Sequence, residues 1–185
     1  MEPIIPFAEH GDADTLPKSH KRRARIIREF IGYDIANLKT LDIGAKNKLG
    51  EVLGIRDNTL DADLNVSVSA PDHDYDLILC SEIFEHICNP YLMMRRIMEL
   101  LKPGGVCILS TPVVGWIIWL PQPNHFTEYS RISLGKFFRY MGFEPEKYRT
   151  TQIWDLSFMF YGVRPLIRVL FKRHQMWMLR KPCRP

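Results

Sequence analysis

The sequence predicts a doubly wound α/β fold, in which helices cover both faces of a mostly parallel sheet. Expected strands and helices alternate from residue 18 to residue 142, which is the pattern of parallel strands joined by helical crossovers. Residues 75–80 form a continuous apolar run, as expected for a strand buried on both faces. A helix then begins after Asn89, ends at the Lys-Pro-Gly-Gly sequence of 102–105, and precedes an apolar strand at 106–111.

The N-terminal part supplies the first helix and the first strands. Residues 1–17 mix prolines with acids and are expected to form a loose lead-in. Residues 18–33 predict a helix, because their apolar side chains recur on one face: Ile26, Ile27, Phe30 and Ile31. Further along we expect strands at 39–43 and 59–64, a short strand at 65–69, and the start of a helix at 50–53.

Two capped helices organise the C-terminal part. Asn89 is a suitable N-cap, and Pro90 fits the first position of the helix that follows. Ser130 is expected to cap a second helix, which Gly142 closes. Residues 143–149 and 152–160 predict two final strands, which we expect to pair as an antiparallel hairpin at the sheet edge.

Length and charge indicate one domain, at residues 18–160, followed by a basic amphipathic segment at 161–185. The 185 residues are 46% hydrophobic and 25% charged, which is ordinary for a globular protein. The net charge is +4, but the chain after Gly162 carries seven basic residues and no acid. Since the rest of the chain is then slightly acidic, no nucleic-acid partner is expected.

The basic segment has three interpretations. Its basic and apolar residues recur near helical spacing: Arg164, Arg168 and Lys172; Leu166, Ile167, Leu170, Phe171, Trp177 and Met178. Such a helix could lie on an anionic membrane, cover a ligand site, or dock on the sheet. Docking is favoured, because apolar stripes usually belong to the core, and weak attraction to a membrane surface is then a secondary effect.

Cysteine usage and the N-terminus indicate the cytoplasm. The four cysteines form no Cys-x-x-Cys pair, so neither a zinc site nor any other metal site is expected. Three of them lie in apolar surroundings, which is typical of buried free thiols in a reducing compartment. The first residues lack the basic and apolar regions of a secretory signal.

The end of the first strand and the end of the second indicate a nucleoside site. Asp42 and Gly44 lie where the first strand turns, but the loop lacks the second and third glycines of a dinucleotide site. A ligand without a pyrophosphate would not need them, which argues against a nicotinamide-dependent reductase. Asp61 follows Gly44 by 17 positions, near the spacing of a ribose-binding acid. Asp63 is the second choice, and the alternative is that both acids face solvent.

Several segments resemble the class I S-adenosylmethionine-dependent methyltransferases, in the group that acts on small molecules and lipids. The resemblance covers about residues 20–150 and is carried by five stretches: residues 41–47 (LDIGAKN), 59–63 (TLDAD), 75–90 (YDLILCSEIFEHICNP), 100–112 (LLKPGGVCILSTP) and 124–144 (NHFTEYSRISLGKFFRYMGFE). The order of strand, Glu-His pair, helix, Lys-Pro-Gly-Gly and strand is the most specific part. The resemblance implies a Rossmann-like methyltransferase sheet, S-adenosylmethionine as cofactor, and a small-molecule or lipid-like methyl acceptor.

The resemblance also implies a site. Asp42, Gly44 and Ala45 would line the methionine moiety of the cofactor, and Asp61 would hold its ribose. Ser81 and Glu82 would contact the cofactor and face the acceptor.

An acceptor that loses a proton needs a general base, and the candidates are Glu82, His86 and His125. A structural role for His86 is an equal alternative, whereas His125 lies in a loop expected to cover the site. Lys46 and Lys48 depart from the small residues usual in the first motif. A methyltransferase fold that only binds, without catalysis, is therefore the alternative function.

Overall fold

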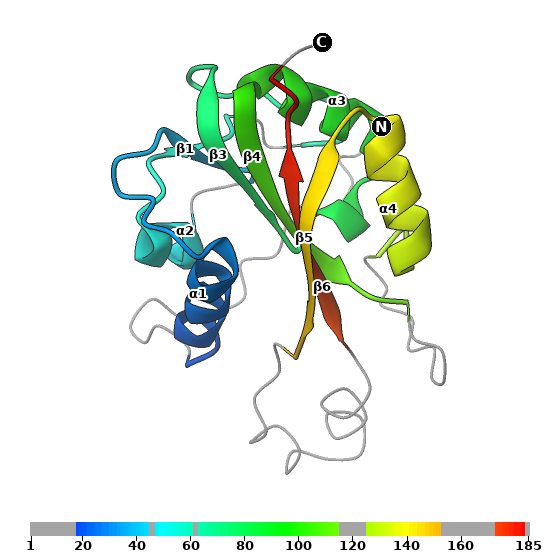
Figure 1. Ribbon diagram of the computed structural model, residues 1–185, viewed down its shortest axis with the longest axis horizontal. Coiled ribbons are helices and arrows are strands. Elements are labelled where there is room, and N and C mark those ends of the chain that lie inside the picture. The colour runs from blue at the N-terminus through cyan, green and yellow to red at the C-terminus, as the bar shows by residue number, and fades with distance from the viewer. Residues whose placement is uncertain (1–17, 45–46, 61–62, 115–124, 153–172, 184–185) are drawn as a thin grey trace.

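The computed structural model describes residues 18–44, 47–60, 63–114, 125–152 and 173–183. These residues form a six-stranded sheet of order β2-β1-β3-β4-β6-β5 (Figure 1). The strands are β1 (Thr40–Asp42), β2 (Asp57–Asn58), β3 (Tyr75–Ser81), β4 (Leu101–Pro112), β5 (Glu144–Thr151) and β6 (His174–Arg180). The first four are parallel, whereas β6 runs antiparallel to both β4 and β5. The predicted fold class, with its antiparallel pair at the sheet edge, is confirmed.

Helices cover the sheet on both sides. One face carries α1 (Lys18–Ile31) and α2 (Lys48–Leu53), and the other carries α3 (Pro90–Leu100) and α4 (Arg131–Tyr140), as Figure 1 shows. A single 3-10 turn, η1 (Phe84–His86), follows β3. The strands thus lie in the middle of three layers, which is why residues 77–80 are buried on both faces.

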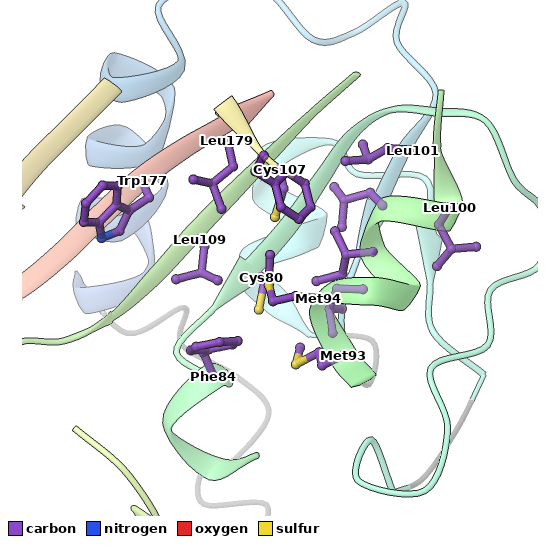
Figure 2. Close-up of a cluster of buried hydrophobic side chains, with 14 of the residues drawn as sticks. Cys80, Phe84, Met93, Met94, Leu100, Leu101, Cys107, Leu109, Trp177 and Leu179 are labelled. Atoms are coloured by element: carbon purple, nitrogen blue, oxygen red, sulfur yellow. The ribbon is translucent and has the colours of Figure 1, made fainter. Parts of the chain in front are cut away.

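Each face of the sheet has its own core. Ile27 and Phe30 of α1 and Leu53 of α2 pack against Leu77 and Leu79 of β3. The opposite core, in Figure 2, joins side chains of α3 to those of β3, β4 and β6 and includes Cys80, Met93, Met94, Cys107, Trp177 and Leu179. All four cysteines are free, but only Cys80 and Cys107 are buried, one fewer than expected.

The helix caps follow the local chemistry of the sequence. Asn89 Oδ1 accepts the amide of Leu92, and Ser130 Oγ accepts the amide of Ser133, so both predicted caps are confirmed. The chain enters β4 at Leu101, directly after α3, and not at residue 106. Gly104 and Gly105 make this early start possible: Gly104 has φ +77°, and a Cβ on Gly105 would lie 2.8 Å from the Tyr75 carbonyl oxygen.

The second strand is shorter and earlier than predicted. It spans only Asp57–Asn58, and the strand expected at 65–69 does not form. The reason is a turn at Asp63, whose carbonyl accepts the amides of Val66 and Ser67 and whose carboxylate accepts the amide of Asn65. These bonds use the polar groups that a strand ladder would need.

The C-terminal segment contains a strand of the sheet. Residues 174–180 form β6, so the prediction of helical spacing through Trp177 and Met178 is wrong for these residues. The side chains alternate instead, with Trp177 in the core beside α3 and α4 and Met178 in the core beside α1. The partner of β5 is therefore β6, and residues 153–160, the expected partner, lie outside the described residues.

This placement changes the division of the chain. The expected boundary at 160 separates β6 from a sheet to which it belongs. The docking interpretation holds for Trp177 and Met178, which are buried, whereas residues 161–172 lie outside the described part. None of the described helices is long and apolar enough to cross a membrane.

We predict that Trp177→Ala lowers the free energy of unfolding by about 3–5 kcal/mol, because it leaves a large cavity beside Phe138 and Tyr148. Trp177 is 5% exposed. The control is Tyr140→Ala, at an aromatic residue that is 80% exposed, which should change stability by less than about 0.5 kcal/mol. Urea unfolding measures both, and equal small losses would contradict the interior position of β6.

Candidate functional site

The strand ends converge at one edge of the sheet. β1, β3 and β4 end there at Asp42, Ser81 and Pro112, and His174 begins β6 opposite Pro112. This is the edge away from the β6 arrowhead in Figure 1. The chain order reverses between β1 and β3, and ligands of open α/β sheets bind beyond the carboxyl ends of the strands at such a reversal. The candidate site is therefore at this edge.

Gly44 forms the turn after β1. Its φ is +116°, and a Cβ here would lie 2.9 Å from the Ile83 side chain, so glycine is required. The Gly44 amide donates to Thr59 Oγ1 over 2.8 Å, and that hydroxyl donates to the Gly44 carbonyl over 3.2 Å. The first loop is thus fixed to the chain that follows β2. Ala45, also predicted for this loop, lies outside the described residues.

Asp42 lies beneath the loop and is 2% exposed. Its Oδ2 accepts Asn47 Nδ2 over 2.8 Å, while Asn47 Oδ1 caps α2 by accepting the amides of Leu49 and Gly50. A Cβ on Gly50 would lie 2.9 Å from Asp42 Oδ2, so glycine allows the helix to approach the carboxylate. Burial raises the pKa of Asp42 to about 7, although the bond from Asn47 acts in the opposite direction. Asp42 therefore organises the loop from below.

Glu82 follows β3 in an unusual backbone conformation. Its φ of +57° lies in the left-handed region, which costs a non-glycine residue on the order of 1 kcal/mol or more and is common at functional sites. The Glu82 amide donates to the Ser110 carbonyl over 2.9 Å, and Ser110 Oγ donates to Glu82 Oε1 over 2.8 Å. β4 therefore holds both the backbone and the carboxylate of Glu82.

Two basic side chains face the other oxygen of Glu82. His174 Nδ1 lies 2.6 Å from Oε2, and Arg23 Nη2 of α1 lies 3.8 Å from it. Burial alone would raise the pKa of Glu82, but His174, Arg23 and the Ser110 hydroxyl outweigh it, and the pKa is lowered. Glu82 is therefore a largely buried carboxylate, 13% exposed, that is held in its charged form.

Ser81 and Ser110 are register partners on adjacent strands. Their hydroxyl oxygens lie 3.0 Å apart, and because the Ser110 proton is donated to Glu82, Ser81 donates to Ser110. The predicted residues Ser81 and Glu82 are thus brought together through Ser110. The sequence reasoning missed Ser110, Arg23 and His174, because one falls inside an apolar strand, one on a basic helix face, and one in the segment interpreted as helical.

The predicted bases His86 and His125 lie in a neighbouring cluster with Glu85, which the sequence did not single out. Glu85 is buried and its Oε2 accepts Thr111 Oγ1 over 2.9 Å, while its backbone carbonyl accepts the amide of Phe126. The His86 and His125 rings meet edge to face at 4.9 Å, and His125 Nδ1 lies 3.2 Å from Glu128 Oε1. The predicted histidines therefore lie side by side.

Glu85 differs electrostatically from Glu82. Burial, and then the negative charge of Glu82, raise the pKa of Glu85. Ligand atoms of Glu85, His86 and His125 lie within 4.8 Å of one another, a spacing compatible with one cation, although the sequence predicted no metal. The surroundings of Glu82 thus favour its charged form, whereas those of Glu85 favour its neutral form.

The two acids proposed for the ribose are not equally placed. Asp63 is exposed, and its carboxylate is used in the turn that ends the second-strand region. Its place in a strand, on which its predicted role rested, is corrected by the short β2. Asp61 lies outside the described residues, so its role stays a prediction.

We predict that Asp42→Asn makes stability less dependent on pH. Because the folded state raises the Asp42 pKa from 3.8 to about 7, it binds the proton more tightly than the unfolded chain. The resulting stability is fully present below pH 3.8 and is lost as pH rises through about 7, by about 1.4 kcal/mol per unit. Asparagine cannot ionise, so the free energy of unfolding of the variant should increase relative to that of wild type as pH rises.

Urea unfolding between about pH 4 and pH 8 tests this linkage. The exposed Asp63→Asn serves as the control variant. A constant difference between wild type and Asp42→Asn across this range would mean that the Asp42 carboxyl titrates alike in the folded and unfolded chains.

Comparison with known proteins agrees with this architecture. A family model for a methyltransferase domain matches residues 16–148. The chain is similar to ubiquinone biosynthesis O-methyltransferases: 32% identical over 117 residues to that of Cereibacter sphaeroides (strain ATCC 17029 / ATH 2.4.9) and 28% over 131 residues to that of Hydrogenovibrio crunogenus. These alignments cover 55% and 56% of this chain and 45% and 54% of the relatives, so the chain spans about half of their length.

Solved structures share the fold. The putative sarcosine dimethylglycine methyltransferase from Galdieria sulphuraria has a TM-score of 0.62 and 16% identity, over 88% of this chain and 86% of the other. The [4+2]-cyclase SpnF has a TM-score of 0.62 and 14% identity, over 94% of this chain and 85% of the other. Phosphoethanolamine N-methyltransferase 2 of Haemonchus contortus, solved with S-adenosyl-L-methionine, has a TM-score of 0.58 and 12% identity, over 88% of this chain and 52% of the other. At these identities the similarity shows the fold alone, whereas the family model covers most of the chain. The chain therefore belongs to the methyltransferase-domain family, among the class I S-adenosylmethionine-dependent methyltransferases.

Proposed function

We propose that this chain transfers the methyl group of S-adenosylmethionine to a hydroxyl group of a small, lipid-like molecule. The observation that carries the proposal is the Glu82 carboxylate, which is held charged beside a buried imidazole where β3 and β4 end. Relatives named as O-methyltransferases of ubiquinone biosynthesis support an oxygen acceptor and a lipid-related molecule.

The cofactor would lie across the loop after β1 and the end of β3. The Gly44 turn would let the backbone approach the methionine moiety, together with Asp42 and Ala45, and Asp61 would accept hydrogen bonds from the two ribose hydroxyls. Ser81 and Glu82 would lie on the side of the cofactor that carries the methyl group. This arrangement needs no pyrophosphate loop, which explains why one glycine is enough after β1.

The reaction is an in-line displacement. The acceptor oxygen attacks the methyl carbon, the bond from carbon to sulfur breaks, and the sulfonium loses its positive charge. Alignment and exclusion of water supply most of the acceleration. A hydroxyl acceptor also loses its proton, so a base near the methyl group contributes about 10²–10⁴-fold.

Two measurements distinguish a methyltransferase from a binding protein without catalysis and from a reductase. A binding protein without catalysis would bind S-adenosylmethionine but methylate no hydroxyl acceptor, and a reductase would bind NADH instead. Isothermal titration with each cofactor, followed by a methyl-transfer assay with phenolic acceptors, distinguishes the three.

We predict that Asp61→Ala weakens S-adenosylmethionine binding by about 1.5–3 kcal/mol, the usual worth of hydrogen bonds to a charged group. This corresponds to an increase of about 10-fold to 150-fold in Kd, measured by isothermal titration. Asp63→Ala is the matched control and should have the smaller effect, because its carboxylate is used in a local turn. A larger effect of Asp63→Ala would assign the ribose contact to Asp63.

Weak contact with a membrane surface is a further proposal for residues 161–173. In the described part, Arg180 pairs with Glu146 and Lys181 donates to the Leu101 carbonyl, so neither is available for lipid. The contact would then depend on Arg164, Arg168, Lys172 and Arg173.

We predict weak, salt-sensitive binding to phosphatidylserine vesicles, at about 1 kcal/mol for each engaged basic residue. Replacing Arg164, Arg168, Lys172 and Arg173 together by Gln should remove it. Cosedimentation that persists in moderate salt would instead indicate apolar insertion.

A further inference from the structure

His174 is a buried histidine that the sequence did not single out. It is 4% exposed and begins β6, opposite Pro112 of β4 and Thr151 of β5. Its position is at the edge where Asp42 and Ser81 also end their strands. Buried polar groups are almost always satisfied, so an imidazole in this place needs an explanation.

One ring nitrogen of His174 has a charged partner and the other does not. Nδ1 lies 2.6 Å from Glu82 Oε2. Within the described residues, neither ring nitrogen makes a hydrogen bond of regular geometry, and Nε2 has no charged partner either. A neutral imidazole with its proton on Nδ1 presents that N–H to the carboxylate and leaves the lone pair of the buried Nε2 without a donor among the described residues.

The carboxylate that faces His174 is rigidly held. Ser110 donates to its second oxygen, and the Glu82 amide is bonded to the Ser110 carbonyl. Arg23 lies farther away, at 3.8 Å, and adds positive charge without displacing the imidazole. An imidazole oriented by a fixed carboxylate is the arrangement that selects one tautomer and stabilises the imidazolium when a proton arrives.

We infer that His174 is the general base for the acceptor hydroxyl and that Glu82 orients it. The inference rests on the proposed methyl transfer to oxygen. It reassigns the role expected for Glu82, which acts through His174, and takes the base role away from His86 and His125. Those two histidines lie beside Glu85 and Glu128, in the neighbouring cluster.

The proton and electron pair balance in one step. The acceptor O–H donates to His174 Nε2 as its oxygen attacks the methyl carbon. The O–H bond breaks and the proton moves to Nε2, the C–O bond forms, and the C–S bond breaks with its electron pair on sulfur. The positive charge of the sulfonium thus reappears on the imidazolium, next to the Glu82 carboxylate. S-adenosylhomocysteine and the methyl ether are the products.

The test compares two phenols that differ in acidity. Catechol keeps its proton in mildly alkaline buffer, whereas 4-nitrocatechol is already ionised and needs no base. His174→Asn keeps an N–H near the position of Nδ1, toward Glu82, but has no nitrogen at Nε2. The matched control is His73→Asn, which changes an exposed histidine far from the site.

His174→Asn should lower kcat with catechol by about 10²–10⁴-fold and with 4-nitrocatechol by less than about tenfold. Binding of S-adenosylmethionine, measured by isothermal titration, should stay close to that of wild type and shows that the variant is folded. The control His73→Asn should behave as wild type with both acceptors. Equal losses with both phenols, or no loss with either, would overturn the inference.

Further outcomes separate this inference from the proposed function. If wild type methylates neither phenol, the proposed function fails and the inference fails with it. If EDTA abolishes catechol methylation while His174→Asn stays active, the proton is handled by a cation at Glu85, His86 and His125. For a variant that does not fold, ¹⁵N NMR of the wild-type imidazoles decides: we expect a proton on His174 Nδ1 and none on Nε2, and the reverse tautomer overturns the inference.

Discussion

The parallel pairing of β3 with β4 is the constraint on which the rest of the structure depends. Both strands are buried between two helical layers, and their register places Ser81 opposite Ser110. Because a shift of one residue would turn every side chain to the other face, the two cores fix this register strongly. The same register puts the Ser110 hydroxyl under Glu82, so the packing of the interior determines where the charged group of the site lies.

The site uses this fixed edge to hold two carboxyl groups in different states. Glu82 gains Ser110, His174 and Arg23 as partners, whereas Glu85 has Thr111 and lies in the field of Glu82. A buried charge is tolerated only with such partners, because desolvation otherwise favours the neutral form. The charge on Glu82 favours the neutral form of Glu85, and a neutral Glu85 in turn does not repel the charge on Glu82.

β6 joins the core to the site. Its alternating residues fill both cores, with Trp177 and Leu179 on one side and Met176 and Met178 on the other. The same strand begins with His174, which meets Glu82 from across β4. An antiparallel strand reverses direction, so its first residue reaches the edge where the parallel strands end. This geometry brings a residue near the C-terminus of the chain beside the end of β3.

The sequence by itself determined the elements whose signals are local. The apolar run of β3, the Asn89 and Ser130 caps and the single glycine after β1 depend on neighbours in the chain, and so the fold class and the cofactor edge could be predicted. Asp42, Gly44, Ser81 and Glu82 could be placed at this edge because they follow these local signals, and their roles toward a cofactor stay predictions. The short β2 was missed because Asp63 bonds to its own turn in place of a strand ladder.

Only the tertiary structure decided that residues 174–180 form the strand β6, which brings His174 to Glu82. A seven-residue strand with apolar residues in sequence also fits a helical stripe, and the choice was made by hydrogen bonds to β4 and β5, which lie far away in the chain.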